Sequence, residues 1–153
     1  MTTFKRPALD PASVPEQGGT GYPAPFRALV ANRFRRPLGD ALGLRNFGVN
    51  LTRLAPGAAS AQRHWHERQD EFVYVVAGEL VLVSDAGDQV LKPGMCAGFP
   101  AGVADGHHLV NRSGKDALYL EIGDRASGDV YHYPDIDLEG RDELARGARA
   151  RDQ

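Results

Sequence analysis

The stretch from Gly57 to Gly78, GAASAQRHWHERQDEFVYVVAG, decides how this chain is organised. His64 and His66 are one residue apart, so on an extended strand both side chains leave the same face. Farther along, Glu71 opens an apolar, β-branched run that ends at Gly78. Imidazoles and carboxylates are ligands that divalent transition metals accept. The stretch therefore predicts one half of a metal site.

A second histidine-bearing window lies between Gly94 and Asn111. It contains the pair His107-His108 just before a short apolar run. Neighbouring residues on a strand point to opposite faces, so only one of the pair is expected to face the first window. Four of the five histidines thus fall in two short windows, and each window lies at the start of a predicted strand.

Short predicted strands continue on both sides of these windows. Residues 47–54, FGVNLTRL, alternate in the manner of a half-buried strand. The apolar runs 71–77 and 79–84 are separated at Gly78, which predicts a hairpin. Turn residues recur at intervals of roughly 8–12 residues, which is typical of an all-β sandwich or barrel. The remaining predicted strands cover residues 89–92, 95–99, 107–111, 117–122 and 130–133.

Both ends of the chain differ from this pattern. Residues 1–25 contain five prolines and a GGTG stretch, which predicts an extended arm that either crosses to a partner subunit or is disordered. Residues 26–36 fit a short strand or a helical turn, and the arginines among them are expected to form a solvated face, with an anion site as the alternative (Arg33, Arg35 and Arg36). Residues 136–153 are highly charged and predict a solvated tail.

The length, composition and net charge of the chain indicate which class of protein it belongs to. A chain of 153 residues with 42% hydrophobic and 25% charged residues predicts one globular domain. The net charge of −2 argues against a nucleic-acid partner, and no apolar run approaches the roughly 20 residues of a membrane span. The N-terminus has no apolar signal segment, and a single cysteine cannot form an internal disulfide. Both observations predict a cytoplasmic protein.

Together the two windows resemble the paired sequence motifs of the cupin family. The matching positions, in order, are Gly57, His64, His66, Glu71, Gly78, Gly94, Pro100, Gly102, His107 and Asn111. The strand pattern extends the resemblance from Phe47 to Gly123. The resemblance implies a cupin-type jelly-roll β-barrel over residues 26–135, preceded by the extended arm (1–25) and followed by the charged tail (136–153).

The same resemblance implies that His64, His66, Glu71 and His107 bind one divalent transition metal per chain, which could be Fe, Ni, Zn, Mn, Co or Cu. Two spacings depart from the family pattern. Six residues, instead of five, separate the first glycine from the histidines, and Asp105 occupies the usual place of the second-motif histidine. The distance to the motif asparagine favours His107, with His108 or Asp105 as alternatives. Asp70 is the alternative to the glutamate.

The family includes dioxygenases, isomerases, epimerases, decarboxylases, lyases and sensors, and fold alone does not choose among them. We expect a metal-dependent enzyme acting on a small polar molecule, of isomerase, epimerase or dioxygenase type. The alternative is a non-catalytic ligand-binding or sensor protein. The inward-facing positions that the pattern identifies are mostly apolar, which weighs against a phosphosugar substrate. The resemblance also implies a homodimer.

We also predict roles for several residues outside the ligand set. Trp65 is expected to face away from the histidines, and Cys96 is expected to be an inert core thiol. His132 fits an exposed edge strand. Glu121 fits either a residue that supports the metal ligands or an outward-facing position. Three arginines are possible anion contacts at the rim, namely Arg53, Arg63 and Arg112.

Overall fold

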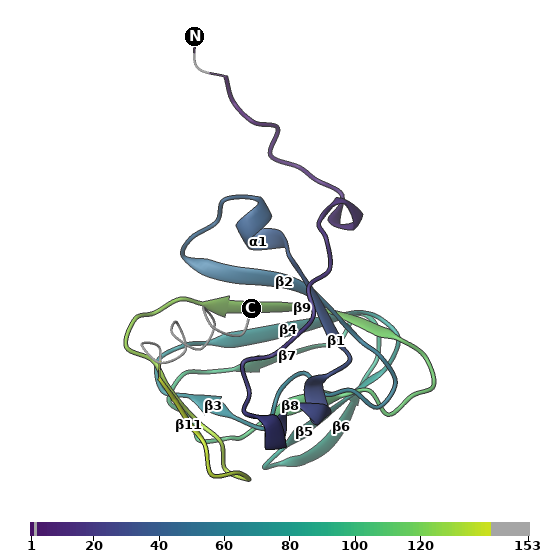
Figure 1. Ribbon diagram of the computed structural model, residues 1–153, viewed down its shortest axis with the longest axis vertical. Coiled ribbons are helices and arrows are strands. Elements are labelled where there is room, and N and C mark those ends of the chain that lie inside the picture. Colours follow the sequence, from purple (N-terminus) through teal and green to yellow (C-terminus); the bar gives the residue numbers. More distant parts are fainter. Residues whose placement is uncertain (2, 142–153) are drawn as a thin grey trace.

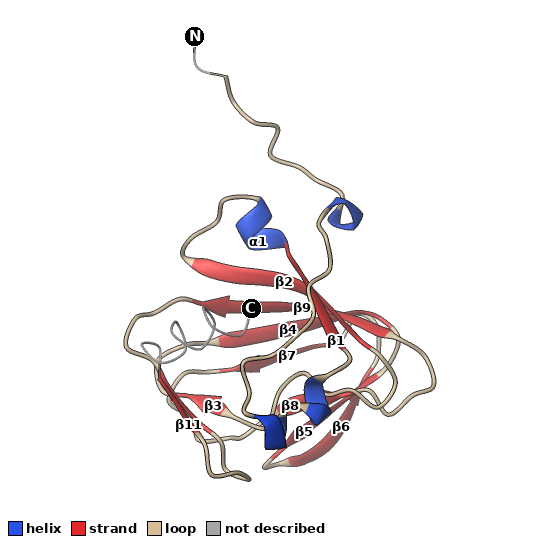
Figure 2. Ribbon diagram, viewed as in Figure 1, coloured by secondary structure: helices blue, strands red, loops and turns tan. Residues whose placement is uncertain are grey.

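The computed structural model of the chain describes residues 1 and 3–141, and most of its regular structure is β-strand (Figure 2). Its strands are β1 (Arg33–Pro37), β2 (Phe47–Leu54), β3 (Trp65–His66), β4 (Glu71–Ala77), β5 (Leu80–Ser84), β6 (Gly87–Leu91), β7 (Cys96–Phe99), β8 (His108–Val110), β9 (Ala117–Asp124), β10 (Val130–His132) and β11 (Glu139–Arg141). Its helical segments are the 3-10 turns η1 (Pro11–Ser13), η2 (Ala24–Phe26) and η3 (Ala28–Val30), and the short helix α1 (Leu38–Ala41).

The strands form three antiparallel sheets (Figure 1). The first has the order β1-β2-β9-β4-β7, the second β6-β5-β8 and the third β11-β10-β3. The apolar core lies between the first two sheets, because its buried members come from both: Leu54, Val73, Val75, Ala117 and Tyr119 on one side, and Leu80, Leu82, Leu91 and Leu109 on the other. The all-β prediction is confirmed. Strand pairing within the described residues leaves the sheets separate, so closure into a jelly-roll barrel stays a prediction.

The predicted hairpin at Gly78 is wrong. The strand before it, β4, pairs with β7 and β9, whereas β5 pairs with β6 and β8. Gly78 therefore takes the chain from one sheet to the other. Its φ of +76° is in the left-handed region, and a Cβ here would lie 2.7 Å from the carbonyl oxygen of Asp116 and 2.8 Å from the Cα of Ala117. Only glycine fits this crossing without strain.

The N-terminal segment is partly packed on the first sheet. The chain before η1 extends away from the body of the molecule (Figure 1), but Gln17 forms an antiparallel bridge with Arg35 of β1. Val14 and Val30 are buried. Residues 26–36 combine both predicted structures, since two helical turns are followed by β1. Of the predicted tail, residues 142–153 lie outside the described part of the chain. No helix within the described part is long and apolar enough to cross a membrane.

Strand alternation overturns two sequence predictions. On β1, Arg33 is only 6% exposed, so the arginines do not form one solvated face. The guanidinium of Arg33 donates to the carbonyl oxygens of Ser60 and Gly19. On β7, Cys96 is exposed rather than buried, because Ala97 and Phe99 are the residues of that strand that pack against the core.

Candidate metal centre

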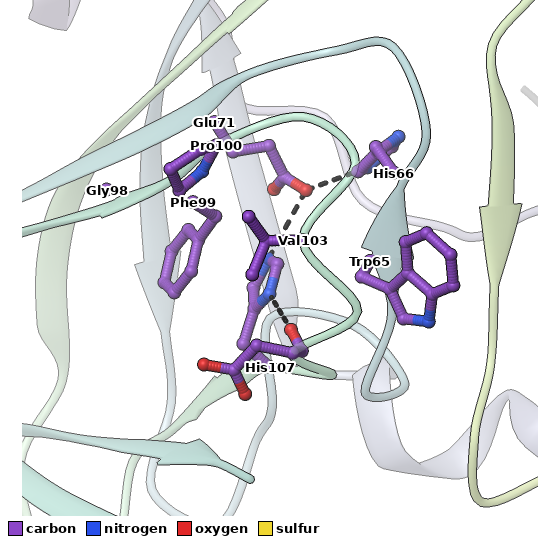
Figure 3. A pocket seen from close by; sticks show the side chains of 9 residues that line it. Trp65, His66, Glu71, Gly98, Phe99, Pro100, Val103 and His107 are labelled. Carbon is purple, nitrogen blue, oxygen red and sulfur yellow. Dashed lines mark hydrogen bonds and ion pairs between the residues drawn. The ribbon is translucent and has the colours of Figure 1, made fainter. Parts of the chain in front are cut away.

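A short backbone contact brings the two histidine windows together. The N–H of His64 donates to the carbonyl oxygen of His107 at 3.2 Å, and the N–H of His107 donates back to His64 at 3.0 Å. Glu71, the first residue of β4, pairs with Phe99 of β7 and Gly123 of β9. Its side chain extends toward the histidines (Figure 3). Segments that are distant in sequence thus meet at one end of the first sheet.

The four predicted metal ligands come together around one carboxylate oxygen. Oε1 of Glu71 lies 3.1 Å from Nε2 of His64, 2.7 Å from Nε2 of His66 and 3.3 Å from Nε2 of His107. Donor atoms of His64, His66 and Glu71 all lie within 4.8 Å of one another. Figure 3 shows the carboxylate of Glu71 with His66 on one side and His107 on the other.

The other ring nitrogen of each histidine has an oxygen partner. Nδ1 of His64 lies 2.9 Å from the carbonyl oxygen of Gln62, and Nδ1 of His107 lies 2.9 Å from that of Asp105. Nδ1 of His66 lies 2.5 Å from Oδ2 of Asp129. Because all three partners are acceptors, each ring keeps a proton on Nδ1 when its Nε2 proton is displaced by a metal, and Nε2 then offers its lone pair. Three such lone pairs beside a carboxylate are a donor set that divalent transition metals accept.

The alternative ligands are engaged elsewhere. Nδ1 of His108 lies 2.8 Å from the carbonyl oxygen of Ala61. The carboxylate of Asp105 accepts from the N–H of Asp85, and that of Asp70 accepts from the N–H of Ala101. These contacts support His107 and Glu71 as the residues that complete the cluster.

Asp129 is a functional candidate that the sequence did not reveal. It is 1% exposed, and its second oxygen accepts the N–H of Arg68 at 2.8 Å. The carboxylate therefore fixes the ring of His66 and also the backbone beside it, as supporting carboxylates do at metal sites. Sixty-three positions separate Asp129 from His66, so no local spacing indicates the pair.

Contacts within the cluster shift the pKa values of Glu71 and His66. Burial disfavours the charged form of Glu71, but hydrogen bonds from His107, His64 and His66 outweigh it and hold its pKa well below the usual range. Burial also disfavours protonation of His66, but the charges and hydrogen bonds of Glu71 and Asp129 raise its pKa to about 9. Protonation of His66 therefore stabilises the metal-free fold. This stabilisation is complete below the pKa of His66 in the unfolded chain, near 6.5, and is lost as the pH rises through the folded-state pKa of about 9.

Aromatic rings and a buried amide lie around the cluster. The ring of Phe99 stacks on His107 with centroids 3.6 Å apart, and Trp65 stacks on His132 at 4.3 Å. Trp65 is thus directed away from Glu71, as Figure 3 also shows. Asn111 is fully buried and donates to the carbonyl oxygens of Leu54 and Lys115, so this motif residue secures the turn after β8.

Two pockets adjoin the cluster and share Glu71, Phe99 and His107. The outer pocket continues along Trp65 and the loop from Gly98 to Asp105. The inner pocket leads toward the core and is lined by polar and apolar residues, among them His64, Val73, Tyr119 and Glu121. Glu121 thus faces inward. The interior is more polar than the sequence pattern predicted, although neither lysine nor arginine is among the residues that line the two pockets.

The three arginines suggested as anion contacts are all paired with acidic residues. Arg53 contacts Glu16 and Asp116, and Arg112 contacts Asp88. Arg63 contacts Asp85 and Asp135 and donates to the carbonyl oxygen of Gly106. Their charges are therefore already balanced by neighbouring carboxylates.

Comparisons with known proteins agree with this geometry. Residues 50–123 match the family described as Cupin domain. A sugar phosphate isomerase of the cupin superfamily from Silicibacter pomeroyi is 43% identical, covering 90% of this chain and 94% of that chain with a TM-score of 0.84. A candidate sugar phosphate isomerase from Acidithiobacillus ferrooxidans is 31% identical, covering 74% and 77% of the two chains with a TM-score of 0.66.

A more distant structure shares the fold alone. The polyketide cyclase from Streptomyces resistomycificus is 21% identical and covers 80% of each chain with a TM-score of 0.60. A comparison with curated protein sequences yields no match.

Proposed function

The chain belongs to the cupin superfamily, and on this basis we propose that it is a metal-dependent isomerase of a small sugar phosphate. The observation on which the proposal depends is the convergence of three imidazole nitrogens on one oxygen of Glu71. The reaction class is supported by the 43% identical relative, which is named a sugar phosphate isomerase.

In this proposal His64, His66, Glu71 and His107 hold one divalent transition metal per chain. Fe, Ni, Zn, Mn, Co and Cu all accept this nitrogen and carboxylate set. A bound metal supplies a Lewis acid that polarises a carbonyl group. Asp129 and the two backbone carbonyls keep the imidazoles in the tautomer that can bind it.

The inner pocket offers complementary surfaces to a small sugar. Glu121 brings a carboxylate that can accept hydrogen bonds from hydroxyl groups, and Val73 and Phe99 provide apolar wall beside it. The same pocket reaches His64, His107 and Glu71. A ligand in this pocket would therefore contact the metal ligands and the polar wall together.

The activity is tested on a panel of pentose and hexose phosphates with protein loaded separately with each metal. We expect interconversion of an aldose and a ketose phosphate, followed by nuclear magnetic resonance in deuterated water. The rate should exceed that of a His64→Ala, His66→Ala protein by about two orders of magnitude, because a metal supplies several kcal/mol of transition-state stabilisation. The control His132→Ala should retain the rate, since His132 pairs with Glu67 outside the cluster.

Binding of a sugar phosphate without turnover, with every metal, would contradict the isomerase and favour the ligand-binding alternative. Turnover that is equally fast in the doubly substituted protein would contradict the role of the metal.

We also propose that the protein is a homodimer joined through the outer face of the first sheet. Three large apolar side chains of β4 project from this face, with exposed fractions of 38% for Phe72, 40% for Tyr74 and 44% for Val76. Partly exposed apolar residues of β9 continue the surface on the neighbouring strand (Leu118, Leu120 and Ile122). Adjacent exposed apolar residues of this size commonly mark protein interfaces.

Light scattering at micromolar concentration should give twice the mass of the chain. The substitutions Phe72→Glu and Tyr74→Glu together should give the monomer mass, because they would bury unpaired charges at the interface. Val90→Glu is the matched control, since Val90 is 48% exposed but lies on β6 in the second sheet. A monomeric wild-type protein would exclude the dimer, and a dimer that survives the double substitution would exclude this face.

A further inference from the structure

Strand β1 directs two arginines toward the space between the sheets. Arg35 of β1 pairs with Thr52 of β2, and Thr52 pairs with Tyr119 of β9. The three residues therefore form one row on the inner face of the sheet. Nε of Arg35 lies 3.5 Å from Oε2 of Glu121, and Thr52 contacts the same oxygen at 3.4 Å. Tyr119 and Glu121 line the inner pocket. Arg35 is therefore a cation that contacts the wall of this pocket through Glu121.

Two guanidinium groups lie close to a single carboxylate in this row. Burial and the charge of Arg35 lower the pKa of Arg33. Burial acts in the same direction on Arg35, but Glu121 and the more distant Glu71 outweigh burial and raise the pKa of Arg35. The next carboxylate, Glu71, faces the three histidines. The contact between Arg35 and Glu121 is long, so an incoming anion would give the guanidinium a second, closer partner.

The two arginines differ in what they can still bind. Arg33 is buried and its two terminal nitrogens donate to backbone carbonyls. Arg35 has one ionic contact among the described residues, the long one to Glu121, and its Nε is enclosed. Even so, 34% of its side-chain surface is accessible to solvent. A guanidinium has five N–H donors, so Arg35 retains donors for an incoming oxyanion.

We propose that Arg35 binds the anionic group of the substrate beside the inner pocket, with Arg33 adding positive charge behind it. The inference rests on the proposed function and adds the group that recognises the phosphate. A carboxylate of a sugar acid has the same recognition chemistry, because arginine pairs with both anions through two parallel N–H donors. No such role fits Arg53, Arg63 or Arg112, whose charges are already paired.

The test measures inorganic phosphate binding to the metal-free protein by calorimetry, so it does not depend on turnover. Arg35→Gln should raise the Kd for phosphate at least about tenfold, because it removes a charge-assisted, forked contact. Arg35→Lys keeps the charge but not the fork, and should give a smaller increase. Glu121→Gln should lower the Kd about threefold or more, because it removes the competing carboxylate.

The matched control is Arg36→Gln, on the same strand one position farther along. Arg36 contacts Val14 and Glu16 on the opposite face and should leave the Kd unchanged. As a local readout, the Nε–H resonance of Arg35, identified by its absence in Arg35→Lys, should shift during the titration. Circular dichroism checks that each variant is folded.

Equal loss of affinity in Arg35→Gln and Arg36→Gln would overturn the proposal, and so would an unchanged Kd in Arg35→Gln or the absence of phosphate binding by the wild type. Parallel titrations with a sugar phosphate and a sugar acid identify which anion binds more tightly. Phosphate binding that depends on Arg35, without any isomerase turnover, would support this subsite while contradicting the proposed reaction.

Discussion

Replacing His64 and His66 together by alanine is expected to lower the affinity for a divalent transition metal by on the order of 10⁴-fold. Four-ligand sites bind zinc with roughly 10–16 kcal/mol, so the loss of two ligands removes several kcal/mol. Both Nε2 atoms lie within 3.1 Å of Oε1 of Glu71 in the present arrangement. The measurement is competition of the purified protein against a chromophoric chelator.

The same substitution should abolish stabilisation by metal. At a free metal concentration of 1,000 times the Kd, the wild type should gain about 4 kcal/mol of unfolding free energy, and its Tm should rise by roughly 10 °C. His108→Ala and His132→Ala are the controls, because neither side chain joins the cluster around Glu71. Full metal loss in His108→Ala with retention in His107→Ala would show that the wrong histidine had been assigned.

Asp129→Asn is expected to weaken metal binding by about 10–100-fold although Asp129 is not a predicted ligand. An asparagine that keeps accepting the N–H of Arg68 through its oxygen presents its NH₂ group to Nδ1 of His66. That donor favours the ring tautomer with the proton on Nε2, which cannot bind metal. Competition against the same chelator measures the change.

The number of protons released on metal binding distinguishes this change of tautomer from a simple loss of packing. In the metal-free wild type, the raised pKa of His66, about 9, keeps the ring protonated at pH 8, so metal uptake should release that proton. Without the charge of Asp129 the pKa should fall and fewer protons should be released. Calorimetry in two buffers with different ionisation enthalpies gives the number of protons released per metal bound. Unchanged affinity and unchanged proton release in Asp129→Asn would exclude the positioning role.

The residues of the metal site that lie close together in the sequence could be predicted from it. His64, His66 and Glu71 lie within eight consecutive positions, and strand periodicity places both histidines on one side. The structure brings His107 to the same carboxylate. Asp129 could not be predicted, because its contact with His66 depends on how β10 pairs with β3.

Other differences arise where neighbouring strands decide which way a residue faces. Arg35 looked like a surface residue, but β2 and β9 place it in a row with Thr52 and Tyr119. Cys96 looked like a core residue, but the alternation of β7 turns Phe99 inward instead. Gly78 was correctly identified as a break between strands, although the strands it separates belong to different sheets. Local patterns thus identified the strands better than their partners.

The most direct test is a crystal structure of the metal-loaded protein with anomalous diffraction recorded at the absorption edge of that metal. One anomalous peak per chain should lie within bonding distance of Nε2 of His64, His66 and His107 and of a carboxylate oxygen of Glu71. A peak bound by other residues, or no peak in protein soaked at saturating metal, would contradict the assignment of this cluster as the metal centre.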